Sequence, residues 1–166
     1  YAIVEWLRVI NYNGQNGKSG IALGNGNGLI ARNNIVNNGI GCSQAGCSGI
    51  SKGYANNGAI YNNIVANISG TGTLVRGIYA SRGLVYNNTV YNITNTGAGE
   101  AVGFNGSANL PTAINNVATN CTTEPFNGGG WNTNSDYNAC DTASCTVGTH
   151  ELSNLNSNDL YVDKAS

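Results

Sequence analysis

A repeated pair of asparagines constrains the fold of this chain more than any other feature. The segment GLIARNNIVNNG, residues 28 to 39, has the same arrangement as GAIYNNIVANISG, GLVYNNTVYNIT and PTAINNVATN further along the chain. The pairs begin at Asn33, Asn62, Asn87 and Asn115, so successive repeats are 29, 25 and 28 residues apart. A period in this range is typical of repeat architectures, in which each unit packs mainly on its neighbours.

The composition favours short strands over helices as the repeating element. Glycine occurs 24 times and asparagine 30 times, together about a third of the 166 residues, and both are poor helix formers. The apolar residues come in groups of two to four, and the leucine ladder of leucine-rich repeats is missing. We therefore predict an all-β fold, a parallel β-helix or solenoid of about five coils with short strands joined by sharp turns.

Apolar residues keep a fixed register to the asparagine pairs. One column, two positions after the second asparagine, consists of Val36, Val65, Val90 and Ala118. Another column, two positions before the first asparagine, consists of Ala31, Ile60, Val85 and Ala113. We expect both columns to line the interior of a solenoid whose coils stack about 4.8 Å apart. Trp6 and Leu7 lie near the place of the pair one coil earlier.

The asparagines themselves suit a corner between two strands. Such a corner needs a residue that tolerates left-handed backbone angles, which asparagine does better than other non-glycine residues. We predict that the second asparagines stack from coil to coil, each side-chain amide donating to the next carbonyl. The predicted ladder consists of Asn34, Asn63, Asn88 and Asn116.

The NNxI coil repeat resembles that of right-handed parallel β-helix proteins of the pectate-lyase-like superfamily, over roughly residues 1 to 120. In the tail, SDYN and NDLYVD resemble the ending of many secreted β-helix proteins, although the usual proline of the last segment is missing. The resemblance, and not the spacing, implies a single-stranded right-handed helix. We predict coils over residues 1–120 and an irregular C-terminal cap of the same domain over residues 121–166.

Two cysteine pairs with identical spacing predict disulfides. The only histidine is His150, so the usual partners of a zinc site are missing. We predict two short-loop disulfides and an extracellular or cell-surface location, with free thiols as the alternative. Cys121 is either a small buried apolar residue or is bonded to something outside this chain. The predicted disulfides join Cys42 to Cys47 and Cys140 to Cys145.

No catalytic residue, metal site or cofactor is predicted. Glycoside hydrolysis needs paired carboxylates, and calcium needs several converging oxygen ligands. Glu5 and Glu100 are the only acids before Glu124, and about four coils separate them. His150 with Glu151 is an alternative acid–base pair, but no nucleophile lies nearby in sequence, so we expect a solvated loop histidine.

The position just before each asparagine pair forms a candidate binding column. It holds Arg32, Tyr61, Tyr86 and Ile114, and because the preceding residue points inward, this column is expected to point outward. Aromatic rings beside a guanidinium suit sugar rings, which makes Arg32, Tyr61 and Tyr86 the candidate glycan-binding residues. The alternative is that the rings stack between coils and only stabilise the sheet. Lys52, Arg76 and Arg82 are candidates for a weak basic strip near the loops, and the favoured alternative is that they are simply solvated side chains.

These features favour a non-catalytic extracellular module that is structural, self-associating or glycan-binding. The alternative is a fragment of a polysaccharide lyase or glycoside hydrolase of the β-helix superfamily.

The net charge of −1 gives no strong field for nucleic acid, and no apolar run is long enough for a membrane span. No cap is visible before AIVEWLRVI, which leaves two alternatives. Either further coils precede this segment in a longer protein, or the N-terminal coil associates head to tail, as a homo-oligomer or filament. Ice binding is less favoured, because only Thr89 occupies the relevant column.

Overall fold

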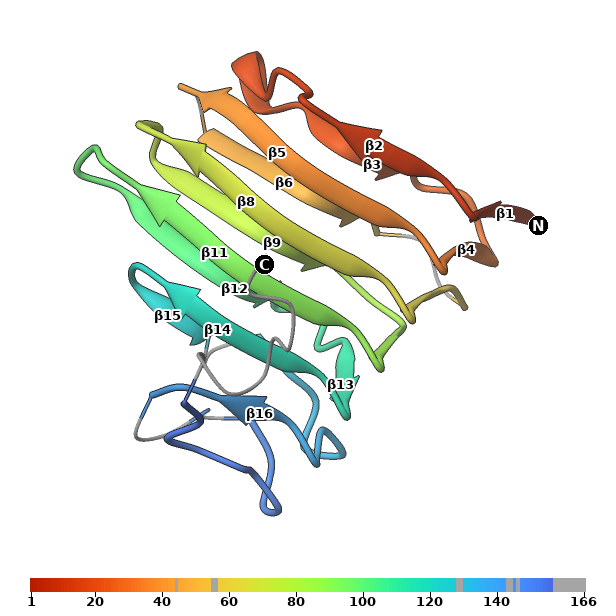
Figure 1. Ribbon diagram of the computed structural model, residues 1–166. Helices are drawn as coiled ribbons and strands as arrows, with labels where there is room; N and C mark the ends of the chain where they lie inside the picture. Colours follow the sequence, from red (N-terminus) through yellow and green to blue (C-terminus); the bar gives the residue numbers. More distant parts are fainter. Residues whose placement is uncertain (44, 55–56, 128–129, 143–144, 146, 157–166) are drawn as a thin grey trace, which may run out of the picture.

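The computed structural model of the chain is a parallel β-solenoid (Figure 1). Three parallel sheets, named A, B and C here, run along its length, and successive strands of the chain enter them in turn. The NDLYVD segment of the tail lies outside the described residues. The structure describes residues 1–43, 45–54, 57–127, 130–142, 145 and 147–156.

The strands are short, and all pairings between them are parallel. Sheet A consists of β1 (Ala2–Glu5), β4 (Leu29–Arg32), β7 (Ala59–Tyr61), β10 (Leu84–Tyr86) and β13 (Thr112–Ile114). Sheet B consists of β2 (Arg8–Ile10), β5 (Ile35–Cys42), β8 (Ile64–Gly70), β11 (Thr89–Asn95), β14 (Val117–Cys121) and β16 (Ala139–Cys140). Sheet C consists of β3 (Ser19–Leu23), β6 (Ala45–Lys52), β9 (Leu74–Ala80), β12 (Glu100–Gly106) and β15 (Glu124–Phe126). A 3₁₀ helix, η1 (Gln15–Gly17), precedes β3.

The predicted all-β solenoid is confirmed. Among the described residues the A–B–C unit of three strands occurs five times, with four steps between coils, and Figure 1 shows the coils following one another from the N-terminus. Two short strands, β15 and β16, lie beyond residue 120 and pair with β12 and β14. The division into coils and cap at residue 120 therefore stays a prediction. No helix in the described part of the chain is long and apolar enough to cross a membrane.

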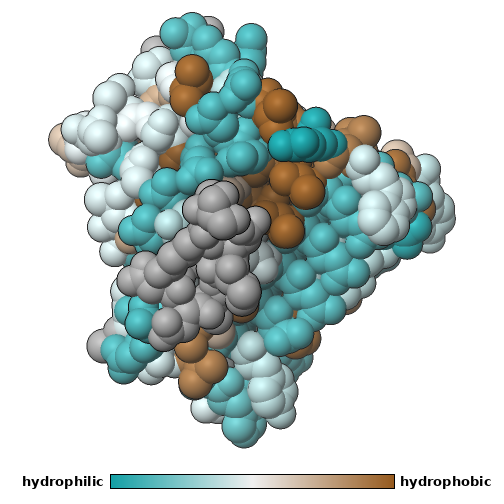
Figure 2. Space-filling model, viewed as in Figure 1, coloured by the Kyte–Doolittle hydropathy of each residue, from teal (hydrophilic) through white to brown (hydrophobic). Residues whose placement is uncertain are grey.

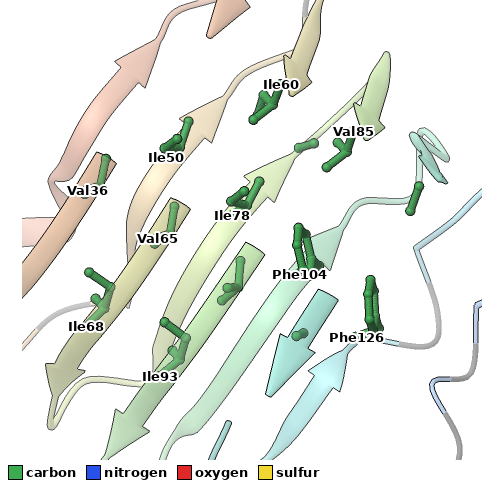
Figure 3. Packing of buried hydrophobic residues seen from close by; sticks show 14 of the residues in the cluster. Val36, Ile50, Ile60, Val65, Ile68, Ile78, Val85, Ile93, Phe104 and Phe126 are labelled. Carbon is green, nitrogen blue, oxygen red and sulfur yellow. The ribbon is translucent and has the colours of Figure 1, made fainter. Parts of the chain in front are cut away.

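The predicted interior columns are also confirmed. Val65 pairs with Val36 on one side and with Val90 on the other, and all three side chains are fully buried. Ile60 and Val85 stack in the same way in sheet A. Figure 3 shows these rows between the sheets, together with a row in sheet C that ends in two stacked phenylalanine rings 4.8 Å apart. The sheet C row consists of Ile50, Ile78, Phe104 and Phe126.

The asparagine ladder forms at the corner between sheets A and B. In each step the side-chain nitrogen and the backbone N–H of one asparagine donate to the side-chain oxygen of the next, at 3.0 to 3.1 Å. Each side-chain nitrogen also donates to a carbonyl of the preceding coil, as Asn63 does to Ala31. The ladder thus satisfies buried amides that would otherwise be costly. Its predicted members are Asn34, Asn63, Asn88 and Asn116, all nearly fully buried.

The ladder is longer than the prediction. Asn116 donates to Asn138, which in turn donates to the carbonyl oxygens of Ala113 and Val147. The residue before Asn138 is Tyr137, with a φ of 55°, so the asparagine pair is replaced there by Tyr–Asn. At the other end Trp6 takes the corner with a φ of 58°. The corner residues of the four pairs, with φ of 53° to 56°, are Asn33, Asn62, Asn87 and Asn115.

A second row of asparagines lies on the outside of sheet B and was missed by the sequence analysis. Asn120 donates its side-chain amide to Asn92 at 3.0 Å, and Asn92 donates to Asn67 at 2.7 Å. All members have a φ between 54° and 58°. The sequence does contain a signal for this row, because an asparagine stands four residues after the second member of each pair. The row consists of Asn11, Asn38, Asn67, Asn92 and Asn120.

Both predicted disulfides are present, with Cα–Cα distances of 5.7 Å for Cys42–Cys47 and for Cys140–Cys145. They indicate an oxidising compartment. Cys121 pairs in register with Ile93, which places it in an inward row, and burial raises the pKa of its thiol to about 12. The inward register favours the small apolar residue over the external bond.

Removing the first disulfide is expected to weaken the fold moderately. A bond between residues five apart restricts only a short loop of the unfolded chain, so the Cys42→Ala/Cys47→Ala variant is expected to lose about 2 kcal/mol of unfolding free energy. Urea denaturation of the variant and of the oxidised wild type measures this difference. An unchanged midpoint would show that the bond does not constrain the loop between β5 and β6.

Candidate functional site

The outer face of sheet A carries two rows of side chains, because alternate residues of each strand point away from the core. One row lies beside the turns that lead into sheet A, and the other lies next to the asparagine corner. The first, the aliphatic row, consists of Ile3, Ile30, Ala59, Leu84 and Thr112. The second, the aromatic row, consists of Glu5, Arg32, Tyr61, Tyr86 and Ile114.

The aromatic row brings together the three predicted glycan-binding residues. Arg32 Nε lies 2.6 Å from Glu5 Oε2, and Arg32 Nη1 donates to the Tyr61 hydroxyl at 2.9 Å. The rings of Tyr61 and Tyr86 stack in parallel with centroids 4.6 Å apart. Because the two rings cover each other's faces, they present mainly edges and hydroxyl groups to solvent. Glycan binding by these residues stays a prediction.

The charges in this row reinforce the contacts. The hydrogen bond to Glu5 raises the pKa of Arg32 above its usual value, and the bond to Tyr61 adds to this effect. Partial burial raises the pKa of Tyr86. The row therefore combines an Arg–Glu ion pair with two stacked phenol rings.

A groove of about 760 Å³ follows the aliphatic row. Its floor includes Ile30, Ala59 and Leu84, and Asn57, Arg82 and Asn109 lie along the side formed by the turns. Arg82 Nη2 donates to Asn109 Oδ1 at 3.2 Å, which links the turns of two neighbouring coils. Ile30, Ala59 and Leu84 were not among the predicted site residues, although their outward direction follows from their place two residues before the aromatic row.

A glycine allows the turns of two neighbouring coils to approach closely beside the groove. Gly83 has a φ of 92°, and a Cβ atom there would collide with the carbonyl oxygen of Gly58 in the preceding coil. The close approach of the two turns therefore requires glycine at this position.

The acids of the described residues are dispersed or paired. Glu5 is held by Arg32, whereas Glu100 and Glu124 lie in neighbouring strands of sheet C. Burial raises the pKa of Glu124, and the charge of Glu100 raises it further. Within the described ranges, no group of three His, Cys, Asp or Glu side chains could hold a metal ion.

His150 pairs with Asp136 and not with Glu151. Its Nδ1 lies 2.7 Å from Asp136 Oδ2, while Glu151 accepts the backbone N–H of Val147. Asp136 also accepts the backbone N–H groups of Tyr137, Thr149 and His150. The hydrogen bond from His150 is the main reason why the pKa of Asp136 is far below its usual value. The carboxylate thus fastens the turn at residues 148–150 to the last coil.

Both interpretations of Lys52, in a basic strip or as a solvated side chain, are wrong. Lys52 pairs in register with Leu23 and Ala80, so it points inward, is 1% exposed and donates to the Arg82 carbonyl at 2.9 Å. Arg76 lies over the ring of Tyr79, with 4.2 Å between the guanidinium carbon and the ring centroid. Strand alternation, which the sequence analysis did not follow as far as Lys52, places this lysine in the interior.

The buried Lys52 amine predicts a pH dependence of stability. Burial lowers the pKa of Lys52 from its usual 10.5, so the unfolded chain binds more protons than the folded one between the two values. Stability should therefore rise with pH through this alkaline window. Denaturation at neutral pH and at about pH 10 should show wild type gaining stability relative to Lys52→Met. A constant difference between the two proteins would contradict the burial of the amine.

The outer face of sheet B is apolar in its middle. Ile35 and Ile64 are paired neighbours with 41% and 48% exposure. Figure 2 shows hydrophobic residues gathered over β5 and β8 among hydrophilic ones. The four strands from β5 to β14 in this sheet contain no charged residue.

A scan against protein-family models finds no match, and searches of curated proteins and of solved structures find none either.

Proposed function

We propose that this chain is a non-catalytic β-solenoid module that binds carbohydrate on the outer face of sheet A. The observation that carries the proposal is the groove along the aliphatic row, which lies beside the aromatic row on the same face. Sugars present apolar ring faces together with hydroxyl groups, so a fitting surface combines apolar area with hydrogen-bonding groups.

The aliphatic row provides the apolar contact, and the aromatic row provides the hydrogen bonds. The stacked faces of Tyr61 and Tyr86 are covered, so the apolar contact comes from the floor of the groove, for example from Leu84. The tyrosine hydroxyls and the Arg32 guanidinium supply hydrogen bonds next to that floor. The glycan-binding interpretation of the sequence predicts instead that the tyrosine rings offer the flat apolar face, beside hydrogen-bond donors such as the Arg32 guanidinium.

A carbohydrate array tests this proposal. We expect the wild type to bind at least one polysaccharide, and the Tyr61→Ala/Tyr86→Ala variant to bind it at least about tenfold more weakly, which corresponds to about 1.4 kcal/mol. Arg8→Ala, an exposed change on the outer side of sheet B, is the matched control and should bind like wild type. Lack of binding to every carbohydrate on the array would contradict the proposal.

The alternative function is that of a polysaccharide lyase or glycoside hydrolase fragment. It would accord with the resemblance to right-handed β-helix proteins of the pectate-lyase-like superfamily, which we propose on the basis of the asparagine ladder between sheets A and B. No described carboxylate pair flanks the groove of sheet A. Measuring polysaccharide cleavage with and without Ca²⁺ separates the two functions, because sustained turnover would rule out the non-catalytic one.

An extracellular or cell-surface site of action is part of the proposal and is supported by the two disulfides. Head-to-tail association stays a prediction. The groups that it would bury are the exposed Ile3, Trp6 and Leu7 of the first coil. Sedimentation velocity over a range of concentrations tests it, and a monomer throughout would count against it.

A further inference from the structure

We propose that the groove of sheet A takes a linear, uncharged glycan that lies parallel to the solenoid axis, with Ala59 as the residue that determines whether the chain fits. This inference rests on the proposed carbohydrate binding and adds the direction, the charge class and a specificity residue.

The direction follows from which coils line the groove. Its residues come from successive coils, from Tyr1 and Ile30 through Ala59 and Leu84 to Thr112. Strands of neighbouring coils lie about 4.8 Å apart, so four steps extend the groove for roughly 19 Å along the axis. A site of this length fits several consecutive sugar rings of an extended chain, and a single ring would contact only part of it.

Polar groups on both sides of the floor fit such a chain. Asn57, Arg82 and Asn109 lie on the turn side. On the opposite side the aromatic row begins two residues further along each strand, so the Cα atoms of Tyr61 and Tyr86 lie about 7 Å from those of Ala59 and Leu84. Hydroxyl groups at both edges of a flat sugar chain would therefore meet donors or acceptors, while its ring faces contact the aliphatic floor.

The charges favour a neutral chain. Arg82 is the only charged side chain among the described residues that line the groove, and it already donates to Asn109. Arg32 in the adjacent row is neutralised by Glu5. A polymer with a carboxylate on every ring would have to desolvate several charges against one guanidinium, which is unfavourable.

Ala59 is the smallest side chain of the aliphatic row. It pairs with Ile30 in the preceding coil and with Leu84 in the following coil, so the floor is lowest between these two larger residues. A larger side chain at this position would fill the middle of the groove and interrupt an axial ligand. Ala66, which lies on the outer side of sheet B between Asn37 and Tyr91, is a matched control for the same change.

Isothermal titration with neutral linear oligosaccharides, from disaccharide to hexasaccharide, of the type found on the array tests the inference. We expect affinity to rise with chain length by at least about tenfold, Ala59→Leu to weaken hexasaccharide binding at least about tenfold, and Ala66→Leu to bind like wild type. Polygalacturonate, an acidic polymer, is expected not to compete. Circular dichroism and thermal unfolding confirm that both variants are folded.

Three results would overturn the inference. They are wild-type affinity in Ala59→Leu, affinity independent of chain length, and binding of polygalacturonate in preference to every neutral chain. If the Tyr61→Ala/Tyr86→Ala variant loses binding while Ala59→Leu keeps it, the proposed function stands and the groove inference fails. If wild type binds no carbohydrate at all, both fail.

Discussion

Replacing Asn63 by alanine is expected to lower the free energy of unfolding by about 3 kcal/mol or more. The side-chain oxygen of Asn63 accepts two hydrogen bonds from Asn34, and its nitrogen donates to Ala31 and Asn88. Alanine leaves the buried backbone N–H of Asn34 and the Ala31 carbonyl without these partners, and each orphaned group costs about 1 to 3 kcal/mol. Urea denaturation followed by circular dichroism measures the loss.

Two further variants distinguish the loss of the ladder hydrogen bonds from the general effect of replacing an asparagine. Asn62→Gly removes the exposed neighbour but keeps a residue that tolerates its φ of 54°, so a change within about 0.5 kcal/mol is expected. Asn63→Asp keeps the shape but cannot donate to Ala31, so it should destabilise at least as much as alanine. Equal losses in Asn62→Gly and Asn63→Ala would contradict the role of the ladder.

Valine in place of Gly77 is expected to destabilise the protein by about 3 kcal/mol through overpacking. A Cβ atom at this position would lie 2.6 Å from the carbonyl oxygen of Gly103 and closer still to Cγ1 of Val90 in the facing sheet. The close approach of sheets B and C across the core therefore leaves no room for a side chain. Thermal and urea unfolding measure the effect.

Gly24→Ala is the control for this substitution. No atom lies within 4 Å of a Cβ built at Gly24, so alanine should be neutral or should stabilise by up to about 1 kcal/mol through the unfolded state. If Gly77→Val does not fold, Gly77→Ala provides a milder version of the same clash. A Gly77→Ala variant as stable as Gly24→Ala would show that the two sheets are further apart than described here.

The repeat architecture could be predicted because it depends on residues in fixed register. Val36, Val65 and Val90 stand at the same offset from the asparagine pair, and this offset alone placed them in one buried column. The ladder followed from the same periodicity. Its continuation to Asn138 was missed because Tyr137 replaces the first asparagine there, and a search for identical pairs does not detect the shared backbone conformation.

The interior position of Lys52 shows where hydropathy misled the prediction. A lysine was assigned to the surface by its charge, whereas its register with Leu23 and Ala80 places it inside. The alternation of the whole strand directs this side chain inward. A backbone carbonyl that accepts a hydrogen bond from the Lys52 amine makes the buried position tolerable. In this fold, strand alternation therefore determines the direction of a side chain more strongly than its charge does.

The candidate site was predictable in part. The outward column of Arg32, Tyr61 and Tyr86 followed from the inward direction of its neighbours. Stacking of the rings between coils, one of the two interpretations of this column from the sequence, is confirmed, whereas its face-to-face geometry depends on rotamers that a sequence does not specify. The groove also depends on the turns, because Asn57 and Asn109 line it from segments whose course the repeat does not determine.

The stacking of coils in register is the central claim, and methyl NOE spectroscopy tests it most directly. With labelled valine methyl groups, we predict contacts between Val36 and Val65 and between Val65 and Val90, since paired strands lie about 4.8 Å apart. Val36 and Val90, two coils apart, should give a much weaker contact or none. Absence of both neighbouring contacts in the folded protein would contradict the stacked solenoid and, with it, the ladder and the groove.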